Sequence, residues 1–341
     1  MTAPFLSLDS ITRRFEPRLT LGDRIAARLG ARVEDRPVRA VTEVSLQIAR
    51  GETLGLVGES GCGKSTLGRV VAGILAPSSG TVLIDGKPVI EHGRKVTTRV
   101  QTVFQDPYAS LDPRMRIGDI VAEGPVAHGL VSKAGAPDYV RDWLSRVGLD
   151  PEFAGRYPHQ FSGGQRQRVA IARALAMQPD LLVCDEPVAS LDVSIQAQII
   201  NLFLELRRDL GITCLFISHD LGVVRHVSDR VAIMYLGRIV EVGTADAIYR
   251  DPRHPYTRAL LGSVPKLVLE SDELVRFETI SGEIPSPLSP PPGCTFHPRC
   301  SIAVEACRGA VPALLEDTEG HRVACHVRAL ERAGASQDGR G

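Results

Sequence analysis

Three features missing from this sequence each argue against a class of protein. No apolar run among its 341 residues reaches the roughly 18 residues that a membrane-spanning helix needs. Residues Met1 to Ser10 have neither the charged start nor the apolar core of a secretory signal. Lys plus Arg and Asp plus Glu both number 40, so the basic excess of a nucleic-acid-binding protein is missing. We therefore expect a cytosolic protein that has no nucleic-acid partner.

Cysteine is scarce as well, with seven residues in the chain. In a cytosolic protein these are expected to be reduced thiols or metal ligands, and no disulfide framework is expected. Hydrophobic residues make up 43% of the chain and charged residues 23%, which is ordinary for a soluble globular protein and argues against disorder. At about 100–200 residues per domain, a chain of this length has room for two or three domains.

The first 265 residues alternate between strand-like and helix-like patterns. Residues 44–48 alternate apolar and polar side chains, and residues 53–57 form a short apolar run that helical spacing follows at 65–75. Further strands are predicted at 5–15, 81–84, 99–104, 181–184, 214–218 and 230–235, and further helices at 137–147, 163–177 and 194–210. Strands interleaved with helices of this length predict an α/β fold with a largely parallel sheet that is covered on both faces.

Two segments interrupt this alternation. Residues 16–38 carry spaced arginines with apolar residues between them, which fits either a basic amphipathic helix on a membrane or partner, or a solvated surface insertion. Beyond residue 265, prolines crowd residues 285–292 and predict a linker. A cysteine-bearing tail follows, and residues 333–341 are expected to be frayed.

A glycine-rich loop follows the apolar run at 53–57 and precedes a predicted helix. Residues 58–65 fit the pattern G-x-x-x-x-G-K-[ST], in which backbone N–H groups and the helix N-terminus face one anion. Lys64 can reach the β- and γ-phosphates of a nucleotide, and the Ser65 hydroxyl can bind Mg²⁺. The predicted nucleotide-binding residues are Gly58, Glu59, Ser60, Gly61, Cys62, Gly63, Lys64, Ser65 and Thr66. The loop alone predicts a nucleoside triphosphatase.

Two acids follow the predicted strand at 181–184. Ligands in open α/β sheets bind at the carboxyl ends of strands, so Asp185 and Glu186 are expected to meet the phosphates. Asp185 would hold Mg²⁺ through water, and Glu186 would orient or deprotonate the attacking water. The alternative is that the two acids merely cap the strand in solvent.

The segment Phe161-Ser162-Gly163-Gly164-Gln165 opens a predicted helix. Ser162 is a good N-cap, and the two glycines leave the helix N-terminus open to a second anion. At this point the chain resembles the ATP-binding cassette (ABC) ATPases, whose signature is Leu-Ser-Gly-Gly-Gln. Phe161 replaces the leucine of that signature, an apolar exchange that we expect to be tolerated.

Other landmarks of the family appear in order. Gln105 in Val-Phe-Gln-Asp-Pro resembles the Q-loop, Asp192 in Ser-Leu-Asp the D-loop, and His219 in Phe-Ile-Ser-His-Asp the switch histidine. Phe15 resembles the aromatic residue that stacks on adenine. Taken singly, Gln105 could cap a loop, Asp192 could cap a helix, and His219 could be a buried histidine. The ordered set is what favours the family.

The resemblance implies an active site shared between two such domains, with ATP and Mg²⁺ as cofactors. Two domains dimerise head to tail, so that ATP on Lys64 faces Ser162 to Gln165 of the other domain. Glu186, His219 and Lys64 would be catalytic, while Ser65, Gln105 and Asp185 would hold Mg²⁺. The implied ABC ATPase domain covers residues 1–265, with an antiparallel β subdomain and a helical subdomain at about 107–177, and a small extension covers 266–341.

Several longer segments of the sequence resemble the oligopeptide/dipeptide importer ATPases. The Phe-Ser-Gly-Gly-Gln form of the signature resembles the second of the two ATPases that such systems usually carry. The matching segments are residues 104–114, 235–243 and 254–261. The resemblance implies a peripheral protein on the cytoplasmic face of the cell membrane that energises uptake of di- or oligopeptides or a similar small solute. Its partners would be two membrane permeases, a sister ABC ATPase and an extracytoplasmic solute-binding protein. The alternative is a soluble ABC ATPase that acts on nucleic acid or ribosomes.

Four cysteines of the tail, Cys294, Cys300, Cys307 and Cys325, form the pattern C-x5-C-x6-C-x17-C. Four thiolates could bind Zn²⁺ or an iron–sulfur cluster, although the spacing matches neither paired zinc motifs nor ferredoxin runs. Reduced cysteines in a small core are the other interpretation. The tail also resembles the extension of peptide-importer ATPases, some of which hold a [4Fe–4S] cluster, and this favours a cluster over zinc.

Overall fold

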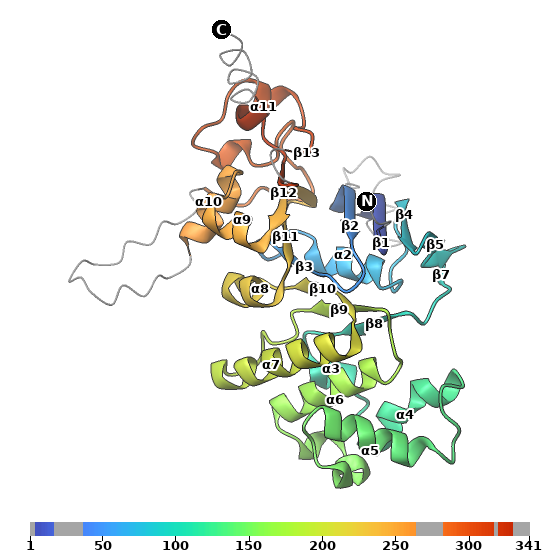
Figure 1. Cartoon of the computed structure of the whole chain (residues 1–341). Coiled ribbons are helices and arrows are strands. Elements are labelled where there is room, and N and C mark those ends of the chain that lie inside the picture. The colour runs from blue at the N-terminus through green and yellow to red at the C-terminus, as the bar shows by residue number, and fades with distance from the viewer. Residues whose placement is uncertain (1–3, 17–36, 264–281, 317–319, 330–341) are drawn as a thin grey trace, which may run out of the picture.

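The computed structural model describes residues 4–16, 37–263, 282–316 and 320–329. Most of the basic segment predicted at 16–38 and all of the segment expected to be frayed lie outside these residues. Figure 1 shows a central body, with a helical part below it and a C-terminal part above it. Within the described ranges, no helix is long and apolar enough to cross a membrane.

An eight-stranded sheet forms the centre, in the order β13-β14-β12-β11-β3-β10-β9-β8. Its parallel strands are β3 (Thr53–Val57), β8 (Val100–Val103), β9 (Leu181–Asp185), β10 (Thr213–Ile217) and β11 (Arg230–Tyr235). The antiparallel edge consists of β12 (Arg238–Thr244), β13 (Leu315–Glu316) and β14 (Arg322–Val323). The predicted parallel pairing is confirmed for the centre of the sheet, whereas one edge is antiparallel because a tight turn joins β11 to β12.

Helices and a second sheet cover both faces of the central sheet, as predicted. Along β10, Leu215 and Ile217 belong to the core shared with the N-terminal sheet and α2 (Lys64–Val71). Cys214 and Phe216, which alternate with them, belong to the core on the other face. The two-residue period of a strand thus divides its apolar side chains between two cores.

Helix α2 ends four residues before the predicted end at residue 75. Gly73 has a φ of 72°, and the N–H of Ile74 donates to the carbonyl of Arg69 at 2.9 Å. This is a left-handed helix end closed by a six-to-one hydrogen bond, which glycine favours because it has no Cβ. The apolar run therefore continues past the helix without being helical.

The N-terminal sheet is antiparallel, with the order β2-β1-β4-β5. Its strands are β1 (Leu6–Phe15), β2 (Val38–Ile48), β4 (Ser79–Ile84) and β5 (Lys87–Pro88), and a small hairpin of β6 (Ile90–Glu91) and β7 (Arg94–Lys95) follows. Leu6 pairs with Ile48 on one side and with Ile84 on the other. This sheet places the ends of β1 and β2 beside the glycine-rich loop.

The helices at the bottom of Figure 1 form a compact group. They are α3 (Pro107–Ser110), α4 (Ile117–Ala127), α5 (Ala136–Arg146) and α6 (Gly163–Leu175), with short 3-10 helices at Pro151–Gly155 and Pro158–Gln160. In α5, the side chains of Val140, Trp143 and Leu144 are buried at helical spacing. The helices predicted at 137–147 and 163–177 are confirmed within two residues at each end.

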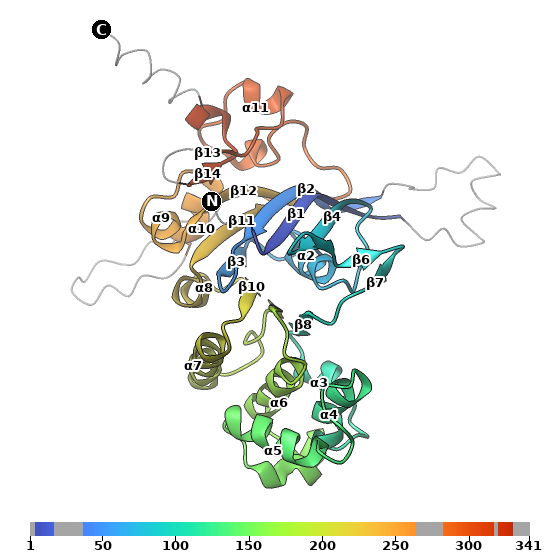
Figure 2. The same cartoon turned by 45° about the vertical axis from the view of Figure 1, so that its right-hand side comes forward.

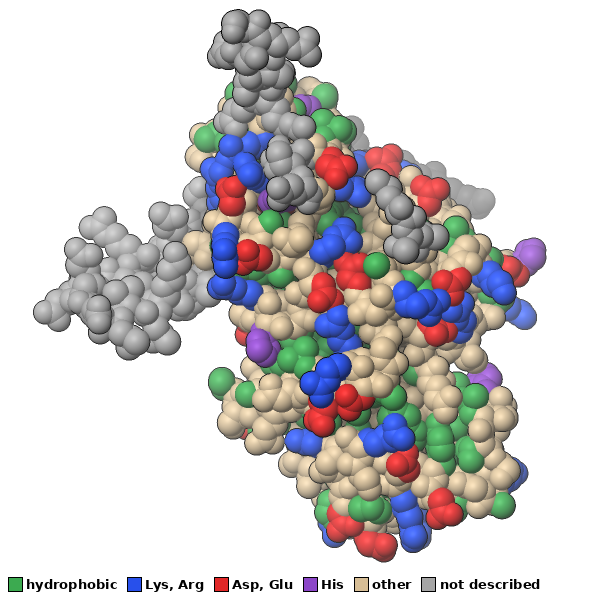
Figure 3. Space-filling model, viewed as in Figure 1, with side chains coloured by type: hydrophobic (Ala, Val, Ile, Leu, Met, Phe, Trp, Pro, Cys, Tyr) green, Lys and Arg blue, Asp and Glu red, His purple; other side chains and the backbone are tan. Residues whose placement is uncertain are grey.

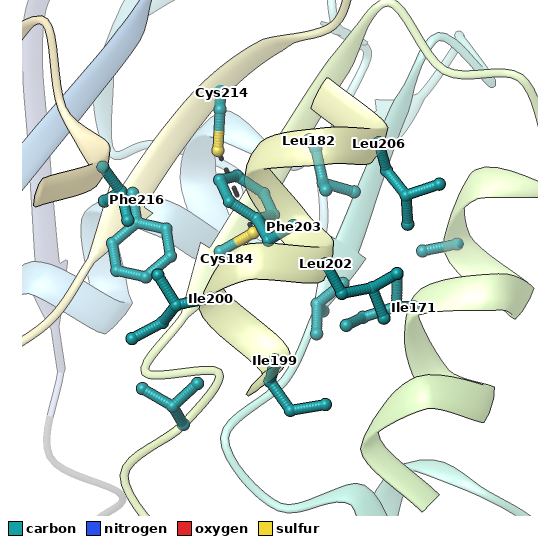
Figure 4. Packing of buried hydrophobic residues seen from close by; sticks show 14 of the residues in the cluster. Ile171, Leu182, Cys184, Ile199, Ile200, Leu202, Phe203, Leu206, Cys214 and Phe216 are labelled. Atoms are coloured by element: carbon teal, nitrogen blue, oxygen red, sulfur yellow. Dashed lines mark hydrogen bonds between the residues drawn. The ribbon is translucent and has the colours of Figure 1, made fainter. Parts of the chain in front are cut away.

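Helix α7 (Val193–Leu210) packs on the face of the sheet that carries Cys184 of β9 and Cys214 and Phe216 of β10. Figure 4 shows its apolar side chains, including Phe203, directed toward Cys184, Cys214 and Phe216 of the strands. The Sγ atoms of Cys184 and Cys214 lie 3.9 Å apart in a hydrogen bond, and burial raises the pKa of the Cys184 thiol. Both cysteines are buried core residues.

The remaining helices are α8 (Leu221–Val227), α9 (Ala245–Arg250), α10 (Pro255–Gly262), a 3-10 helix at His297–Arg299 and α11 (Ala306–Gly309). Residues 282–316 and 320–329 form what we call the C-terminal extension, which lies above β11 and β12 in Figure 2. Its strand β14 pairs with β12, with Glu241 opposite Val323. The extension is therefore joined to the central sheet by strand pairing.

Candidate nucleotide-binding site

A cavity of about 430 Å³ brings together residues from distant parts of the chain. Lys64 and its loop form the floor, Gln105 and Glu186 come from the ends of β8 and β9, and Phe15 comes from β1. The cavity is lined by Phe15, Val38, Ala40, Ser60, Gly61, Gly63, Lys64, Ser65, Thr66, Gln105, Glu186 and Pro287. Most of the predicted nucleotide-binding residues thus surround one space.

Two glycines of the loop leave no room for a side chain. A Cβ at Gly58 would lie 2.1 Å from the carbonyl oxygen of Met234, and one at Gly63 would lie 2.0 Å from that of Ala40. Gly63 also has a φ of 107°, which residues with a Cβ rarely adopt. The loop is therefore packed backbone to backbone against β11 and β2, and this fixes its N–H groups at the mouth of α2.

The ammonium group of Lys64 is held inside its own loop. Its Nζ donates hydrogen bonds to the carbonyls of Gly58 at 2.7 Å and Glu59 at 3.0 Å, and the residue is only 5% exposed. Cys62 belongs to the same loop. Its side chain is buried, and burial raises the pKa of its thiol. The loop therefore carries a positive charge that the backbone positions.

The predicted magnesium ligands Ser65 and Asp185 are in contact. The Ser65 hydroxyl donates to Oδ1 of Asp185 at 2.8 Å. Burial raises the pKa of Asp185, while the Ser65 hydrogen bond and nearby cations oppose that shift. A hydroxyl, a carboxylate and the amide oxygen of Gln105 beside the cavity are the hard oxygen donors that Mg²⁺ prefers, so the residues present fit this ion.

Glu186 and His219, the predicted catalytic pair, also lie together. Nδ1 of His219 is 3.2 Å from Oε1 of Glu186. Glu186 has a φ of 49°, and its N–H donates to the carbonyl of Ile217 at the end of β10. A left-handed backbone is uncommon for a residue with a Cβ, and here the junction of two strands holds it in place.

Phe15 lies at the rim of the cavity beside Val38 and Ala40. Its ring is partly exposed, and the guanidinium carbon of Arg13 lies 4.8 Å from the ring centroid. An exposed aromatic face at this point is able to stack on a nucleotide base. The prediction for Phe15 thus has a geometric basis despite the long segment between Phe15 and the loop.

The residues of the signature segment lie away from this cavity. Ser162 caps α6, and Ser162 and Gln165 exchange hydrogen bonds in a capping box of 3.3 and 3.0 Å. Gly163 is near Leu191, and a Cβ at Gly164 would lie 2.5 Å from Cγ2 of Ile195 in α7. The chain does not bring its own signature to its own Lys64, and a site in which the two meet needs a second domain.

Asp192 stands at the N-cap position of α7, but its side chain makes no capping hydrogen bond. Two residues before Asp192, the hydroxyl of Ser190 donates a hydrogen bond to the carbonyl of Gln105, in the predicted Q-loop, at 3.5 Å. No side-chain hydrogen bond therefore supports the interpretation of Asp192 as a helix cap. Ser190 thus links the predicted D-loop to the predicted Q-loop.

A backbone hydrogen bond joins two of the four cysteines of the C-terminal extension. The N–H of Cys294 donates to the carbonyl of Cys307 at 2.8 Å. Burial raises the pKa of Cys294 to about 11, and Cys307, Cys325 and Cys300 contribute in the same direction. Even so, the described residues contain no group of three or more His, Cys, Asp or Glu that could hold a metal ion.

The histidines near these cysteines have other partners. His321 contacts Oε1 of Glu241 at 2.7 Å, His297 contacts the carbonyl of Cys294 at 2.9 Å, and His326 contacts that of Ala310 at 2.9 Å. None of the three contacts joins a histidine ring to a cysteine sulfur.

Sequence reasoning missed three residues around the loop. Pro287, from the predicted linker, lines the cavity, and its carbonyl accepts from the N–H of Arg39 at 3.4 Å. The Tyr256 hydroxyl accepts from the N–H of Glu59 at 2.9 Å, and Arg299 pairs with the Glu59 carboxylate. Tyr256 lies in the segment 254–261 that resembles the importer ATPases, but no pattern in the sequence pairs Tyr256, Arg299 or Pro287 with the phosphate loop.

Comparisons with known proteins agree with this geometry. Residues 41–189 match the ABC transporter family, and residues 240–307 match the C-terminal region of oligopeptide/dipeptide transporters. A structure of cbiO1 from Clostridium perfringens, part of an ABC transporter complex, has a TM-score of 0.59 at 29% identity and covers 73% of this chain and 91% of its own. An ATP-binding cassette dimer in a post-hydrolysis state with ADP and Pi has a TM-score of 0.58 at 27% identity, covering 70% and 98%.

Relatives match over most of the chain. A probable peptide ABC transporter ATP-binding protein of Sinorhizobium fredii is 50% identical over 86% of this chain and 83% of its own. The oligopeptide transport ATP-binding proteins AppF of Bacillus subtilis and OppF of Salmonella typhimurium are 50% and 47% identical, each over 85% of this chain and over 90% and 88% of their own. On this evidence the chain belongs to the ATP-hydrolysing, ATP-binding subunits of ABC transporters, in the branch with the oligopeptide/dipeptide transporter C-terminal region.

Proposed function

We propose that this chain hydrolyses ATP to energise the uptake of di- or oligopeptides, or a similar small solute, through an ABC importer. The observation that carries the proposal is the match of residues 240–307 to the oligopeptide/dipeptide transporter C-terminal region, together with relatives near 50% identity that are named for peptide transport. The phosphate loop, the Ser65–Asp185 pair and the Glu186–His219 pair supply what an ATPase needs.

The chemistry follows from the positions of these groups. Backbone N–H groups of the loop and the Lys64 ammonium bind the phosphates, and Phe15 stacks on the base. Ser65, Asp185 and Gln105 would hold Mg²⁺, which neutralises phosphate charge when bound. Glu186 accepts the proton of the attacking water, and His219, 3.2 Å away, orients Glu186 and contacts the γ-phosphate.

The signature helix acts on the nucleotide of a partner domain. Ser162, Gly163, Gly164 and Gln165 present the N-terminus of α6 away from Lys64 of the same chain, with Asp192 beside them at the start of α7. ATP held between two domains would bind them together, and hydrolysis would release them. The partner domain would be a sister ABC ATPase or a second copy of this chain.

The assembly would contain two membrane permeases and an extracytoplasmic solute-binding protein, with this chain peripheral on the cytoplasmic face. On the face shown in Figure 3, Lys and Arg side chains are interspersed with Asp and Glu. Nucleic acid is bound by surfaces on which basic side chains dominate, so this face favours the transporter over the nucleic-acid alternative.

The test is co-purification from native membranes in mild detergent under anaerobic conditions. The proposal predicts two polytopic permeases and a second ATPase with this chain, while a Lys64→Ala variant assembles equally well but hydrolyses no ATP. Recovery of the chain with nucleic acid or ribosomes and without a permease would overturn the proposal.

A finer part of the proposal concerns Cys294, Cys300, Cys307 and Cys325, which we propose hold a [4Fe–4S] cluster, with Zn²⁺ as the alternative. Support comes from the resemblance of the tail and from the backbone hydrogen bond that joins Cys294 to Cys307. Four thiolates would suit either group, since Cys₄ is the ligand set of structural Zn²⁺ sites and of iron–sulfur clusters alike. Iron, sulfide and zinc content of anaerobically purified chain decides between these, and absence of all three dismisses both.

A further inference from the structure

An arginine of the C-terminal extension reaches into the phosphate loop. Nη1 and Nη2 of Arg299 donate to Oε2 and Oε1 of Glu59 at 2.9 and 3.1 Å, which is a two-pronged ion pair across 240 positions of sequence. The Arg299 side chain is 4% exposed and that of Glu59 is 19% exposed. The charge of Arg299 therefore depends on Glu59, because the buried guanidinium has little water to replace its partner.

Aromatic side chains enclose this pair. The rings of Tyr235 and Tyr256 have centroids 4.7 Å apart, and that of Phe296 lies 5.2 Å from the first and 5.4 Å from the second. Arg299 also donates to the Tyr235 hydroxyl at 3.4 Å. The arginine is thus fixed by packing as well as by charge, and Phe296, three residues before it, belongs to the same extension.

Glu59 lies at a sensitive point of the loop. Its carboxylate pairs with Arg299, its N–H donates to Tyr256, and its carbonyl accepts from Nζ of Lys64 at 3.0 Å. Two bonds from outside the loop therefore fix the residue whose carbonyl holds the phosphate-binding ammonium. An ion pair whose only role is to attach the C-terminal extension to the central sheet does not need to involve a residue of the phosphate loop, as Glu59 is.

A second part of the extension touches the same cavity. Pro287 lines the cavity on the side of Val38 and Ala40, and its carbonyl bonds to the N–H of Arg39. The extension therefore meets the site at two separated points, one beside the phosphate loop and one beside the base-stacking residues. The cavity includes a wall that lies outside the segment matched to the ABC transporter family.

We propose that Arg299 is a positioning residue for ATP binding, through which the C-terminal extension sets the shape of the phosphate loop and hence the affinity for nucleotide. Arg299 orients Glu59, and Glu59 presents its carbonyl to Lys64 at the start of the phosphate cradle. Arg299 itself does not line the cavity. The proposal rests on the ATPase activity of the chain and is independent of which solute the transporter carries.

The test uses the full chain in its transporter complex and compares KM for ATP with kcat. Arg299→Met keeps side-chain length and removes the charge, and we expect it to raise KM about tenfold while kcat stays within about twofold. Arg299→Lys, which keeps charge but loses the two-pronged geometry, should fall between this variant and wild type.

The matched control is Arg238→Met. Arg238, on β12, forms an ion pair of 3.1 Å with Glu43 of β2, and neither residue of this pair bonds to Glu59 or Lys64. A merely structural ion pair predicts that both methionine variants lower the melting temperature and leave KM for ATP unchanged. Equal KM values in Arg299→Met, Arg238→Met and wild type would overturn the proposal.

A double-mutant cycle covers the case in which Arg299→Met fails to fold. Glu59→Gln removes the charge that Arg299 serves, so adding Arg299→Lys to it should raise KM by less than Arg299→Lys does alone. Full additivity of the two changes would contradict coupling through Glu59. If wild type itself hydrolysed no ATP, the function would fail instead, and direct binding of MgADP to the same variants would still test the positioning role.

Discussion

The hydroxyl of Ser65 donates a 2.8 Å hydrogen bond to Oδ1 of Asp185, which lies 120 positions further along the chain. Ser65 stands in the first turn of α2, and Asp185 ends β9, so the bond joins the phosphate loop to the carboxyl edge of the sheet. Two oxygen ligands suited to Mg²⁺ meet there. The relationship leads to the first prediction.

Asp185→Asn should raise the Mg²⁺ concentration needed for half-maximal ATPase activity by at least about tenfold, because a neutral amide binds a hard cation less well than a carboxylate does. A Mg²⁺ titration at saturating ATP measures this effect. Asp220→Asn is a suitable control, since Asp220 caps α8 and does not line the cavity. An unchanged Mg²⁺ dependence in Asp185→Asn would contradict the role assigned to Asp185.

Glu186→Gln should bind ATP yet lose hydrolysis by about 10²–10⁴-fold, because the amide cannot accept the proton of the attacking water. Bound ATP should then hold two ATPase domains together, which size-exclusion chromatography with light scattering detects. Glu59 is an acidic residue of the phosphate loop, but its carboxylate is paired with Arg299, so Glu59→Gln should not trap a dimer. Near-normal turnover in Glu186→Gln would remove it from the mechanism.

Gly164→Ala should destabilise the contact of α6 with α7, because its Cβ would lie 2.5 Å from Cγ2 of Ile195. Overpacking of this kind costs about 1–3 kcal/mol and should displace the start of the signature helix, so ATPase activity should fall as well. Gly155→Ala is the matched control, since a Cβ there meets nothing within 4 Å. Thermal unfolding of the two variants gives the comparison, and equal melting temperatures would refute the packing argument.

Stability should fall as the pH drops below about 6.5, owing in part to His254. Burial lowers the pKa of His254 to about 4, with the carboxylate of Glu241 opposing the shift. The folded state therefore keeps this imidazole neutral while the unfolded chain takes up a proton, and the cost grows as pH falls from about 6.5 to about 4. Between pH 7 and 5 the loss amounts to about 2 kcal/mol.

His254→Asn isolates this contribution. Nδ1 of His254 accepts the N–H of Tyr256 at the start of α10, and asparagine preserves such a cap without titrating. Denaturant unfolding at pH 7 and pH 5 should show a smaller pH dependence in the variant by about 2 kcal/mol. The same pH dependence in both proteins would mean that other groups account for it.

Local patterns predicted the elements that position the site. The strands at 53–57 and 230–235 were predicted to the residue, because each is a short apolar run between turn residues. The end of α2 was predicted too late, since the apolar sequence continues past Gly73 while the backbone there turns left-handed. A helix end of this kind depends on one glycine and cannot be recognised from the pattern of apolar residues.

The parts of the site that could not be predicted from the sequence depend on contacts between residues far apart in the chain. The proline-rich segment predicted as a linker places Pro287 in the cavity, and Arg299 meets Glu59 across 240 positions. The composition of both segments resembles that of ordinary loops and carries no sign of their partners. In contrast, the phosphate loop, Asp185 and Glu186 were predictable because their spacing reflects one local geometry, a strand followed by a loop.

The account is tested most directly by transport in proteoliposomes that contain the transporter complex purified with this chain. ATP is enclosed on the side where this chain lies, the solute-binding protein and labelled di- and oligopeptides are supplied on the other side, and peptide accumulation is measured. The account predicts accumulation that requires ATP hydrolysis and disappears in Glu186→Gln complexes of unchanged composition. Equal accumulation with the Glu186→Gln complex, or ATP hydrolysis that no peptide-loaded binding protein stimulates, would contradict it.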